Sequence, residues 1–458
     1  MDLRNEKVVV VGLGTSGMDA CLLLNDLGAI VSATDSGSSD DLKKNSKILS
    51  EKYIEVEIGT HTEGFLAGSD LMVISPGVSK DALPIQYAIA NNRPLISELE
   101  LGFACCKGSI VAVTGTNGKS TVVTLIGEIL KKAGKKVVVC GNIGNSLCGE
   151  IHNIDSNTIV VLEVSSFQLE WIVDFRPKIS CILNITEDHL ERYISFEDYV
   201  KTKMKIFSKQ ESRDLTILNY DDVGLRHPKE PIKAKTLYYS KNKKVNGIYC
   251  QDGDVIYNKG GKSKKLFSMP SSRLKGEYNI ENILAAVLIA LTEGADLDSI
   301  KEAVEGFIPL RHRMEYLGNV NGIEFIDDSK ATNIDATKRA LESLDKKVIL
   351  IAGGRDKGGD YALVKDEIVA KVDKLVLIGE AATRMNDFFK GFVKEIELCD
   401  TLEEATRSAF SGAKNKQIVL LSPMCSSFDM FSSYKERGDV FKKTIEEIKS
   451  QPHKITRV

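Results

Sequence analysis

The chain has 458 residues, of which 27% are charged and 43% are hydrophobic, a composition typical of globular proteins and not of disordered ones. Its 61 basic and 64 acidic residues give a formal net charge of -3. A nearly neutral chain has no bulk positive field to hold nucleic acid or an anionic membrane, so any anion must be bound locally. At roughly 150 residues per domain, the length predicts about three domains.

Membrane insertion and secretion are not expected from this sequence. The longest uninterrupted apolar run, residues 283–291, is far shorter than the ~20 residues that a spanning helix needs. The N-terminus enters a strand pattern at once and shows no signal-peptide pattern. The nine cysteines are scattered without CxxC pairs, which favours reduced thiols over zinc or disulfides. We therefore expect a cytoplasmic protein.

Short apolar runs with strand character alternate with helical patterns along most of the chain. The predicted strands, in chain order, are residues 7–11, 30–34 and 71–75, then 110–114, 136–140, 158–164 and 179–184, and finally 323–326, 347–352, 374–378 and 417–421. Strands that are apolar on both faces and separated by helices predict parallel sheets in α/β layers.

The segment 216–270 differs, because it is polar and rich in turn residues, which predicts β-hairpins inserted into the middle unit. We place the domains at residues 1–107, 108–309 and 310–458. The predicted fold is α/β with a Rossmann-like N-terminal domain, a central P-loop domain that carries the small β-rich insertion, and a Rossmann-like C-terminal domain.

The first strand is followed by a glycine pattern typical of dinucleotide-binding proteins. Gly12, Gly14 and Gly17 form G-x-G-x-x-G, and Asp35 ends the next strand. Glycines allow a tight turn and close approach of the backbone to a diphosphate, which then meets the N–H groups of a helix N-terminus. By itself the pattern predicts NAD binding, but it cannot name the nucleotide, and a tight strand-to-helix turn without a ligand stays open.

The second unit begins with a phosphate-binding loop. Residues 110–121, IVAVTGTNGKST, place Gly115, Gly118, Lys119 and Ser120 between a strand and a helix. Such a loop surrounds phosphate oxygens with backbone N–H groups, brings an ammonium to the outer phosphates and offers a hydroxyl to Mg²⁺. Val113 stands where the strict pattern has its first glycine, so this loop is a shorter variant.

Polar residues follow several later strands. Glu163 ends one strand, and Asp188 and His189 follow another. Glu163 could hold Mg²⁺, which prefers oxygen ligands. In the third unit, polar loops contain residues 328–333, 355–357 and 426–427. Because ligand sites form at the carboxyl ends of parallel strands, we expect these three loops to meet at one sheet edge.

The sequence resembles the Mur ligase family of peptidoglycan precursor synthesis. The resemblance is carried by TGTNGKST, GNIGN, EVSSFQLE, LNITEDHLERY, RHRME, DDSKATN and LLSPMCSSFD, which occur in order across all three units. It implies an enzyme that adds D-glutamate to UDP-MurNAc-L-alanine with ATP, through an acyl phosphate and a tetrahedral intermediate. It also implies two Mg²⁺ ions, a carbamylated Lys203, a monomer, and a first domain that binds UDP instead of NAD.

The same resemblance assigns residues to four sites. The catalytic and metal-binding set is Lys119, Ser120, Glu163, His189 and Lys203. ATP would be bound by Gly115, Thr116, Asn117, Gly118, Lys119, Ser120, Thr121, Asn279, Asn282, Arg313 and Asp328. The UDP-substrate would be bound by Gly14, Thr15, Ser16, Asp35, Ser75, Asn142 and Ser165. D-Glutamate would be bound by Lys330, Thr332, Lys357 and Ser427.

Other functions compatible with the motifs are a related ligase that adds a different amino acid, a folate-extending ligase, an NAD-dependent enzyme fused to a P-loop module, and a nucleotide-regulated binding protein. A folate enzyme would normally lack the first unit. An NAD-dependent enzyme would need residues for hydride transfer, and the sequence shows no such set.

Overall fold

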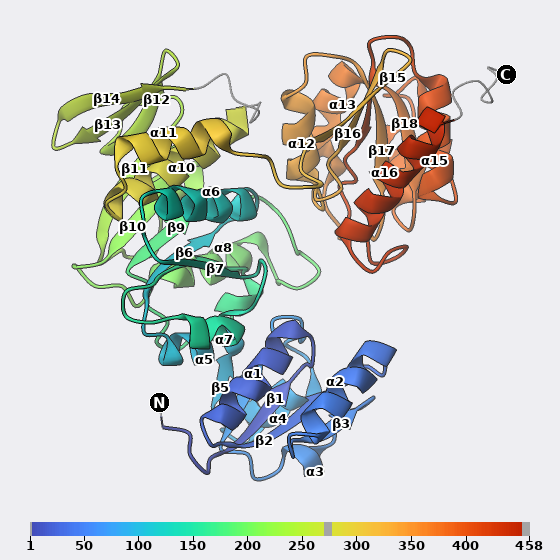
Figure 1. The fold of residues 1–458 in the computed structure, drawn as a ribbon. Helices are drawn as coiled ribbons and strands as arrows, with labels where there is room; N and C mark the ends of the chain where they lie inside the picture. Colours follow the sequence, from blue (N-terminus) through green and yellow to red (C-terminus); the bar gives the residue numbers. More distant parts are fainter. Residues whose placement is uncertain (1, 270–276, 451–458) are drawn as a thin grey trace. The chain divides into compact units, whose positions relative to one another are not determined.

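The computed structural model describes residues 2–269 and 277–450, and these form two compact units. The first unit comprises Met1–Ile185, Glu197–Pro270 and Glu281–Gly306, and the second comprises Thr186–Phe196, Ser271–Ile280 and Phe307–Val458. The first unit contains a five-stranded and a nine-stranded sheet, and the second contains a six-stranded sheet (Figure 1). The sequence assigned residues 186–196 to the central domain, whereas the structure groups them with the C-terminal unit.

The first sheet has the strand order β3-β2-β1-β4-β5, and all of its neighbouring strands are parallel. Its elements are β1 (Lys7–Val11), α1 (Thr15–Asp26), β2 (Ile30–Asp35), α2 (Asp40–Ser50), β3 (Glu55–Ile58), α3 (Glu63–Leu66), β4 (Leu71–Ile74), α4 (Leu83–Ala90), β5 (Leu95–Ser97) and α5 (Glu98–Cys105).

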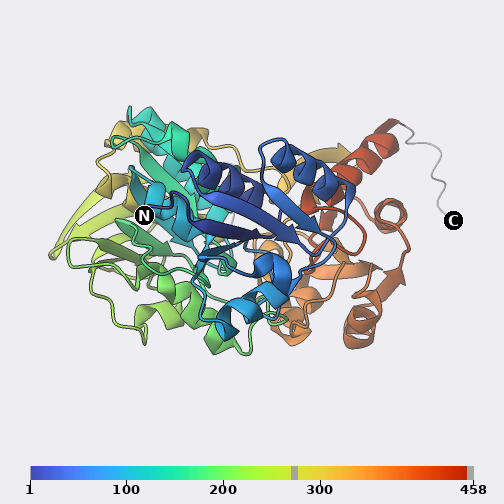
Figure 2. The same ribbon diagram turned by 90° about the horizontal axis from the view of Figure 1, so that it is seen from below.

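Helices cover both faces of this sheet, as the two views in Figures 1 and 2 show. Val10 packs in one apolar cluster with Leu24 of α1, while Val9 packs in another with Ile85 of α4. Both valines are almost fully buried. The continuous apolar run of β1 is therefore explained by burial on two sides, as the sequence predicted.

The second sheet has the order β14-β13-β12-β11-β10-β9-β6-β8-β7. Its strands are β6 (Ser109–Thr114), β7 (Val137–Gly141), β8 (Ile159–Glu163), β9 (Ile179–Ile182), β10 (Leu215–Asn219), β11 (Lys235–Ser240), β12 (Gly247–Gln251), β13 (Asp254–Lys259) and β14 (Lys262–Ser268). Its helices are α6 (Lys119–Lys132), α7 (Leu147–Glu150), α8 (Phe196–Met204), α9 (Val223–Arg226), α10 (Glu277–Thr292) and α11 (Leu297–Gly306), with short 3₁₀ turns at Ile151–Asn153, Phe167–Leu169 and Lys205–Phe207.

The prediction of hairpins over residues 216–270 is correct only for the second half of that segment. The strands β10 and β11 pair in parallel with each other, and β10 pairs in parallel with β9. Antiparallel pairing begins between β12 and β13 and continues between β13 and β14. These strands extend the main sheet and do not form a separate insertion, because β11 and β12 are also paired.

The third sheet has the order β15-β16-β20-β17-β18-β19. Its elements are β15 (Glu315–Val320), β16 (Ile323–Asp327), α12 (Ile334–Glu342), β17 (Val348–Gly353), a 3₁₀ turn (Tyr361–Val364), α13 (Lys365–Lys371), β18 (Val372–Ile378), α14 (Ala382–Phe389), β19 (Glu395–Leu398), α15 (Leu402–Gly412), β20 (Ile418–Leu421) and α16 (Tyr434–Ser450). Leu350 of β17 packs with Met385 of α14, and its neighbour Ile351 packs on the other face with Phe441 of α16.

The α/β fold class with parallel-rich sheets is thus confirmed, and each predicted strand coincides with a strand of the structure. Of these strands β7 lies at a sheet edge, and the others lie in the sheet interiors. The domain boundaries at 107/108 and 309/310 stay predictions. None of the helices in the described ranges is both long enough and apolar enough to cross a membrane. All nine cysteines are free.

The first glycine turn generates a stability prediction. A Cβ on Gly17 would collide with the carbonyl oxygen of Gly12, whereas a Cβ on Gly14 would meet nothing within 4 Å. Gly17→Ala should therefore lower the free energy of unfolding by about 1–3 kcal/mol or more through overpacking. The matched variant Gly14→Ala should cost less than about 1 kcal/mol, since Ala is only a poorer helix cap. Equal denaturant midpoints for the two variants would contradict this account of the turn.

Candidate active site

The phosphate-binding loop lies between β6 and α6. Gly118 caps the N-terminus of α6 in the left-handed conformation, with φ of 87°, which favours glycine. The first N–H groups of a helix have no partner within the helix and carry a partial positive charge, so this helix start can bind an anion. A Cβ on Gly118 would also clash with the side-chain oxygen of Asn282, which places this predicted ATP residue directly beside the loop.

Asn184, which follows β9, holds the loop in shape. Its side-chain oxygen accepts a hydrogen bond from the backbone N–H of Asn117 at 2.8 Å, and its side-chain nitrogen donates to the carbonyl of Asn117 at 3.1 Å. Its own carbonyl accepts from the N–H of Thr116 at 2.9 Å. Asn184 lies in the LNITEDHLERY motif, but no role was predicted for it from the sequence. Its position directly after a predicted strand was the available signal.

Lys119 turns its ammonium back over the loop. The Nζ atom donates to the carbonyls of Gly115 and Thr116, both at 2.8 Å. The ammonium group of Lys119 therefore lies beside the loop whose backbone N–H groups would surround a phosphate. This position fits the predicted contact with the outer phosphates of a nucleotide.

Glu163 lies at the end of β8, beside the loop. In the sheet register Glu163 is opposite Val113 of β6 and Gly141 of β7. Its Oε1 atom accepts from the side-chain amide of Asn142 at 2.8 Å, while its buried Oε2 atom has no hydrogen-bond partner. A buried carboxylate oxygen without a partner is costly unless a cation or a donor occupies the site. Together with the buried hydroxyl of Ser120, it provides the hard oxygen donors that Mg²⁺ prefers.

Lys203 is buried in α8, with 2% exposure, although its neighbours Lys201 and Lys205 are exposed. Its Nζ donates to the carbonyl of Gly115 at 2.9 Å and lies 4.7 Å from the ring centroid of Tyr199. The Tyr199 hydroxyl is 3.2 Å from the Thr116 hydroxyl. Of the three lysines at alternate positions, Lys203 alone is buried, and its ammonium contacts the phosphate-binding loop.

The N-terminal glycine turn is closed by side chains predicted to bind UDP. The two carboxylate oxygens of Asp35 accept from the backbone N–H groups of Leu13 and Gly37, each at 2.8 Å. The Ser75 hydroxyl donates to the carbonyl of Gly12 at 2.8 Å. Asp35 and Ser75 therefore shape the turn, while Gly14, Thr15 and Ser16 stand at the start of α1, where a diphosphate would contact backbone N–H groups.

Ser165 and Thr121 are further residues of the first unit that were predicted to bind substrates. Ser165 exchanges hydrogen bonds with Gln168, and Thr121 is buried in the first turn of α6. Asn279 of α10, which belongs to the second unit, is also buried.

In the second unit, three polar loops meet at one sheet edge as the sequence predicted. Asp327 at the end of β16 is opposite Leu421 of β20, which is opposite Ile351 of β17. The loops after these strands carry, respectively, Lys330 and Thr332, Ser427, and Lys357. The Nζ atom of Lys330 lies 4.1 Å from the ring centroid of Tyr434.

The loop that carries Lys330 is held by the segment before β15. His312 lies with φ of 62° and contacts Asp327 with 2.7 Å between Nδ1 and Oδ2. The carbonyl of His312 accepts from the N–H of Lys330, and the N–H of Met314 donates to Asp328 at 3.2 Å. The side chains of His312, Glu315 and Asp327 also lie close enough together to hold a metal ion. Their contacts with one another explain this arrangement, because they join the segment before β15 to the end of β16.

Asp328 is a buried carboxyl group with an altered proton affinity. Burial raises its pKa from 3.8 to about 7, against the opposing effects of hydrogen bonds from Ser422 and Met314. Asp327 raises the pKa further, and Arg313 lowers it.

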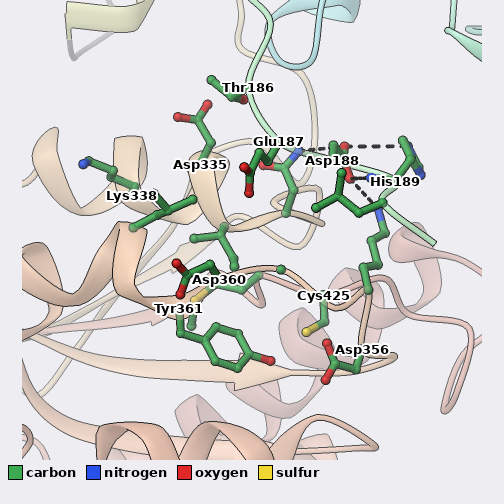
Figure 3. A pocket seen from close by; sticks show the side chains of 17 residues that line it. Thr186, Glu187, Asp188, His189, Asp335, Lys338, Asp356, Asp360, Tyr361 and Cys425 are labelled. Atoms are coloured by element: carbon green, nitrogen blue, oxygen red, sulfur yellow. Dashed lines mark hydrogen bonds and ion pairs between the residues drawn. The ribbon is translucent and has the colours of Figure 1, made fainter. Parts of the chain in front are cut away.

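Residues 186–190 and the loops after β17 and β20 line a cavity of about 310 Å³ (Figure 3). On its wall, Lys357 forms an ion pair with Asp188 at 3.1 Å. His189 lies beside this pair, 3.6 Å from Asp188 and 3.2 Å from Glu191. The structure therefore brings together Lys357 and His189 in the second unit, and Lys119, Ser120, Asn142, Glu163, Lys203 and Asn282 around the phosphate-binding loop of the first.

Comparison with known proteins finds three family models that match successive parts of the chain. Residues 6–97 match the model of the Mur ligase MurD-like N-terminal domain, residues 113–290 the Mur ligase middle domain, and residues 312–425 the Mur ligase glutamate ligase domain. The chain belongs to the Mur ligase family.

Curated relatives of this Mur ligase match over nearly their whole length. A UDP-N-acetylmuramoylalanine--D-glutamate ligase of Geotalea daltonii is 42% identical, covering 96% of this chain and 97% of the relative. One of Thermoanaerobacter pseudethanolicus is 39% identical, covering 98% and 100%.

Solved structures of similar fold include the UDP-N-acetylmuramate-alanine ligase MurC of Thermotoga maritima. It has a TM-score of 0.60, 20% identity and coverage of 96% of this chain and 99% of that one. MurF of the same organism, in complex with ADP, has a TM-score of 0.56 at 17% identity, covering 97% and 96%. These likenesses show the fold.

The pKa of Asp328 makes the stability of this Mur ligase depend on pH. The pKa of this carboxyl group is 3.8 in the unfolded chain and about 7 in the folded one. Between these pH values the folded state therefore binds a proton that the unfolded state has lost. Stability should fall as pH rises through this window, by roughly 4 kcal/mol at most, and the cost should be absent below it. Asp328→Asn should remove this loss in denaturant titrations at pH 4 to 8. Asp366→Asn, an exposed carboxylate on α13, serves as the control, and parallel curves for wild type and Asp328→Asn would refute the assignment.

Proposed function

We propose that this chain ligates D-glutamate to UDP-MurNAc-L-alanine and converts ATP to ADP and phosphate in the same reaction. The observation that carries the proposal is the 42% and 39% identity to proteins named for this reaction, over 96% and 98% of the chain. The similarity therefore includes the glycine turn, the phosphate-binding loop and the three polar loops of the C-terminal sheet. The reaction belongs to peptidoglycan precursor synthesis.

The first task of the enzyme is to activate a carboxylate. A carboxylate is a poor acyl donor until one of its oxygens becomes part of a phosphate leaving group. The phosphate-binding loop and Lys119 hold the triphosphate of ATP, and their positive character reduces the repulsion between the γ-phosphate and the attacking carboxylate. The amine of D-glutamate then attacks the acyl phosphate, and phosphate leaves from a tetrahedral intermediate.

Ser120 and Glu163 are the residues of the first unit that would hold Mg²⁺, since a hydroxyl and a buried, unsatisfied carboxylate oxygen suit this ion. His189 is the proposed ligand of a second Mg²⁺. When bound, Mg²⁺ neutralises charge on the phosphates during the transfer. Asn142 holds the other oxygen of Glu163 and so orients the carboxylate.

The UDP part of the substrate is proposed to bind at the first glycine turn, with its diphosphate over Gly14, Thr15 and Ser16 and the remaining contacts from Asp35, Ser75, Asn142 and Ser165. The adenosine triphosphate contacts extend to Asn279, Asn282, Arg313 and Asp328. D-Glutamate is proposed to bind in the second unit, at Lys330, Thr332, Lys357 and Ser427.

We infer a cytoplasmic location from the nine free thiols, which suit a reducing compartment. The monomeric state stays a prediction.

The proposal is tested by phosphate release from the full-length protein with ATP, Mg²⁺ and UDP-MurNAc-L-alanine, supplied with one amino acid at a time. D-Glutamate should give the highest kcat/KM, and L-alanine, L-glutamate and meso-diaminopimelate should be poor acceptors. Lys119→Ala should retain no more than a few per cent of the activity, because its ammonium serves the outer phosphates. A better rate with another amino acid would instead support a related ligase, and release that needs no amino acid would contradict ligation.

We further propose that Lys203 is carbamylated in the active enzyme and supplies an anionic oxygen to Mg²⁺. Its buried position beside the phosphate-binding loop supports this role, since an ammonium there would repel the ion. Carbamylation leaves one N–H on Nζ, which can still donate to the carbonyl of Gly115, and adds an anionic carboxylate beyond it.

Lys203→Ala should accordingly lower kcat by more than about tenfold, as the loss of a group that supports a metal site does. Added formate or acetate should restore part of the activity by supplying the missing carboxylate. Lys201→Ala, which removes an exposed lysine from the same helix, is the control and should behave like the wild type. Failure of both acids to restore any activity, or full activity of Lys203→Ala, would count against carbamylation.

A further inference from the structure

The cavity in the second unit has a charged pair on its wall, Asp188 and Lys357, and the proposed function gives a role only to the lysine. Asp188 belongs to the segment 186–196, and Lys357 to the loop after β17. The distance between their charged atoms is 3.1 Å, and their side chains are 8% and 16% exposed. Asn333 donates a further hydrogen bond to the second oxygen of Asp188 at 3.0 Å. Figure 3 shows Asp188 across the cavity from Tyr361 and Cys425.

Such a pair contributes little net stability. Removing two charges from water costs free energy that their mutual attraction barely recovers. Exchanging each partner for an equivalent charge is therefore much easier than breaking the pair and leaving one charge buried alone. A ligand that brings both an ammonium and a carboxylate into the cavity would satisfy this condition.

The other buried or half-buried carboxylates that line the cavity are already held by arginines. Asp335 contacts Arg339 at 2.9 Å, and Asp356 accepts two hydrogen bonds from Arg384, both at 2.8 Å. These pairs lie within the second unit and contain none of the residues that are proposed to bind a carboxylate of D-glutamate. Asp188, in contrast, is paired with the lysine that the proposed function assigns to a carboxylate of D-glutamate.

We propose that Asp188 is the receptor for the ammonium group of the incoming amino acid, and that it exchanges Lys357 for this ammonium when the substrate binds. Lys357 then pairs with a carboxylate of the same substrate, so one internal ion pair becomes two ion pairs with the ligand. The inference rests on the proposed function, because it assumes that the cavity belongs to the amino-acid site.

This role is recognition and not proton transfer. Both carboxylate oxygens of Asp188 accept hydrogen bonds, one from Lys357 at 3.1 Å and the other from Asn333 at 3.0 Å, so the group is arranged to hold a positive donor. The ammonium must lose its proton to another group before the amine attacks.

The test compares D-glutamate with glutarate, which has the same two carboxylates and no amine. For the full-length enzyme with saturating ATP and UDP-MurNAc-L-alanine, the measurements are the KM of D-glutamate and the inhibition constant of glutarate against it. Asp188→Asn should raise the KM about ten- to a hundredfold, the usual effect of losing a charged hydrogen bond. The glutarate constant should stay within about threefold or decrease, because Lys357 is released for a carboxylate.

Two further variants complete the comparison. Lys357→Gln should weaken both D-glutamate and glutarate, and this pattern can be read even if Asp188→Asn folds poorly. Asp366→Asn removes an exposed carboxylate of the same unit and should change neither constant. The inference is overturned if Asp188→Asn weakens both ligands equally, if it leaves the KM of D-glutamate unchanged, or if Lys357→Gln spares glutarate. A wild-type enzyme that does not use D-glutamate would instead overturn the proposed function.

Discussion

The parallel pairing of β6 with β8 and β9 is the constraint on which the phosphate-binding site depends. Parallel strands end at the same edge of a sheet, so the register that places Val113 opposite Glu163 and Cys181 also delivers the loops after all three strands to one place. Asn184 can hold the loop after β6 because it follows β9, the neighbouring strand. The same rule operates in the second unit, where β16, β20 and β17 are neighbours although β20 is distant in sequence.

Both units contain charged side chains that are buried. Lys203 and Glu163 lie near the phosphate-binding loop, and Asp188, Asp328 and Arg437 are buried in the second unit. Arg437 is satisfied by the carbonyls of Ser329, Cys425 and Ser426 and by the Ser329 hydroxyl, and so ties α16 to two of the polar loops. Because unpaired buried charges are costly, groups of this kind persist where partners or ligands compensate them.

Most interior strands outside residues 216–270 were predicted from the sequence because burial on both faces produces uninterrupted apolar runs. The strands that were missed, β3, β5, β15 and β19, all lie at the edges of their sheets. Edge strands are often short and partly polar, as in Glu55–Ile58, whose sequence EVEI contains no continuous apolar run. The parallel strands β10 and β11 were mistaken for hairpins because turn residues surround them, and turn residues give no information about which strands pair.

The sequence by itself determined the family, the α/β class, the glycine turn and the phosphate-binding loop, because these depend on residue types at fixed spacing within one strand-turn-helix unit. Only the tertiary structure decided which of three neighbouring lysines is buried, since Lys201, Lys203 and Lys205 look alike until α8 packs against the loop. It also decided that residues 186–196 join the second unit and that Asp188 meets Lys357, which is 169 positions away in the sequence. Contacts of this kind follow from the topology of the sheets, which no local spacing records.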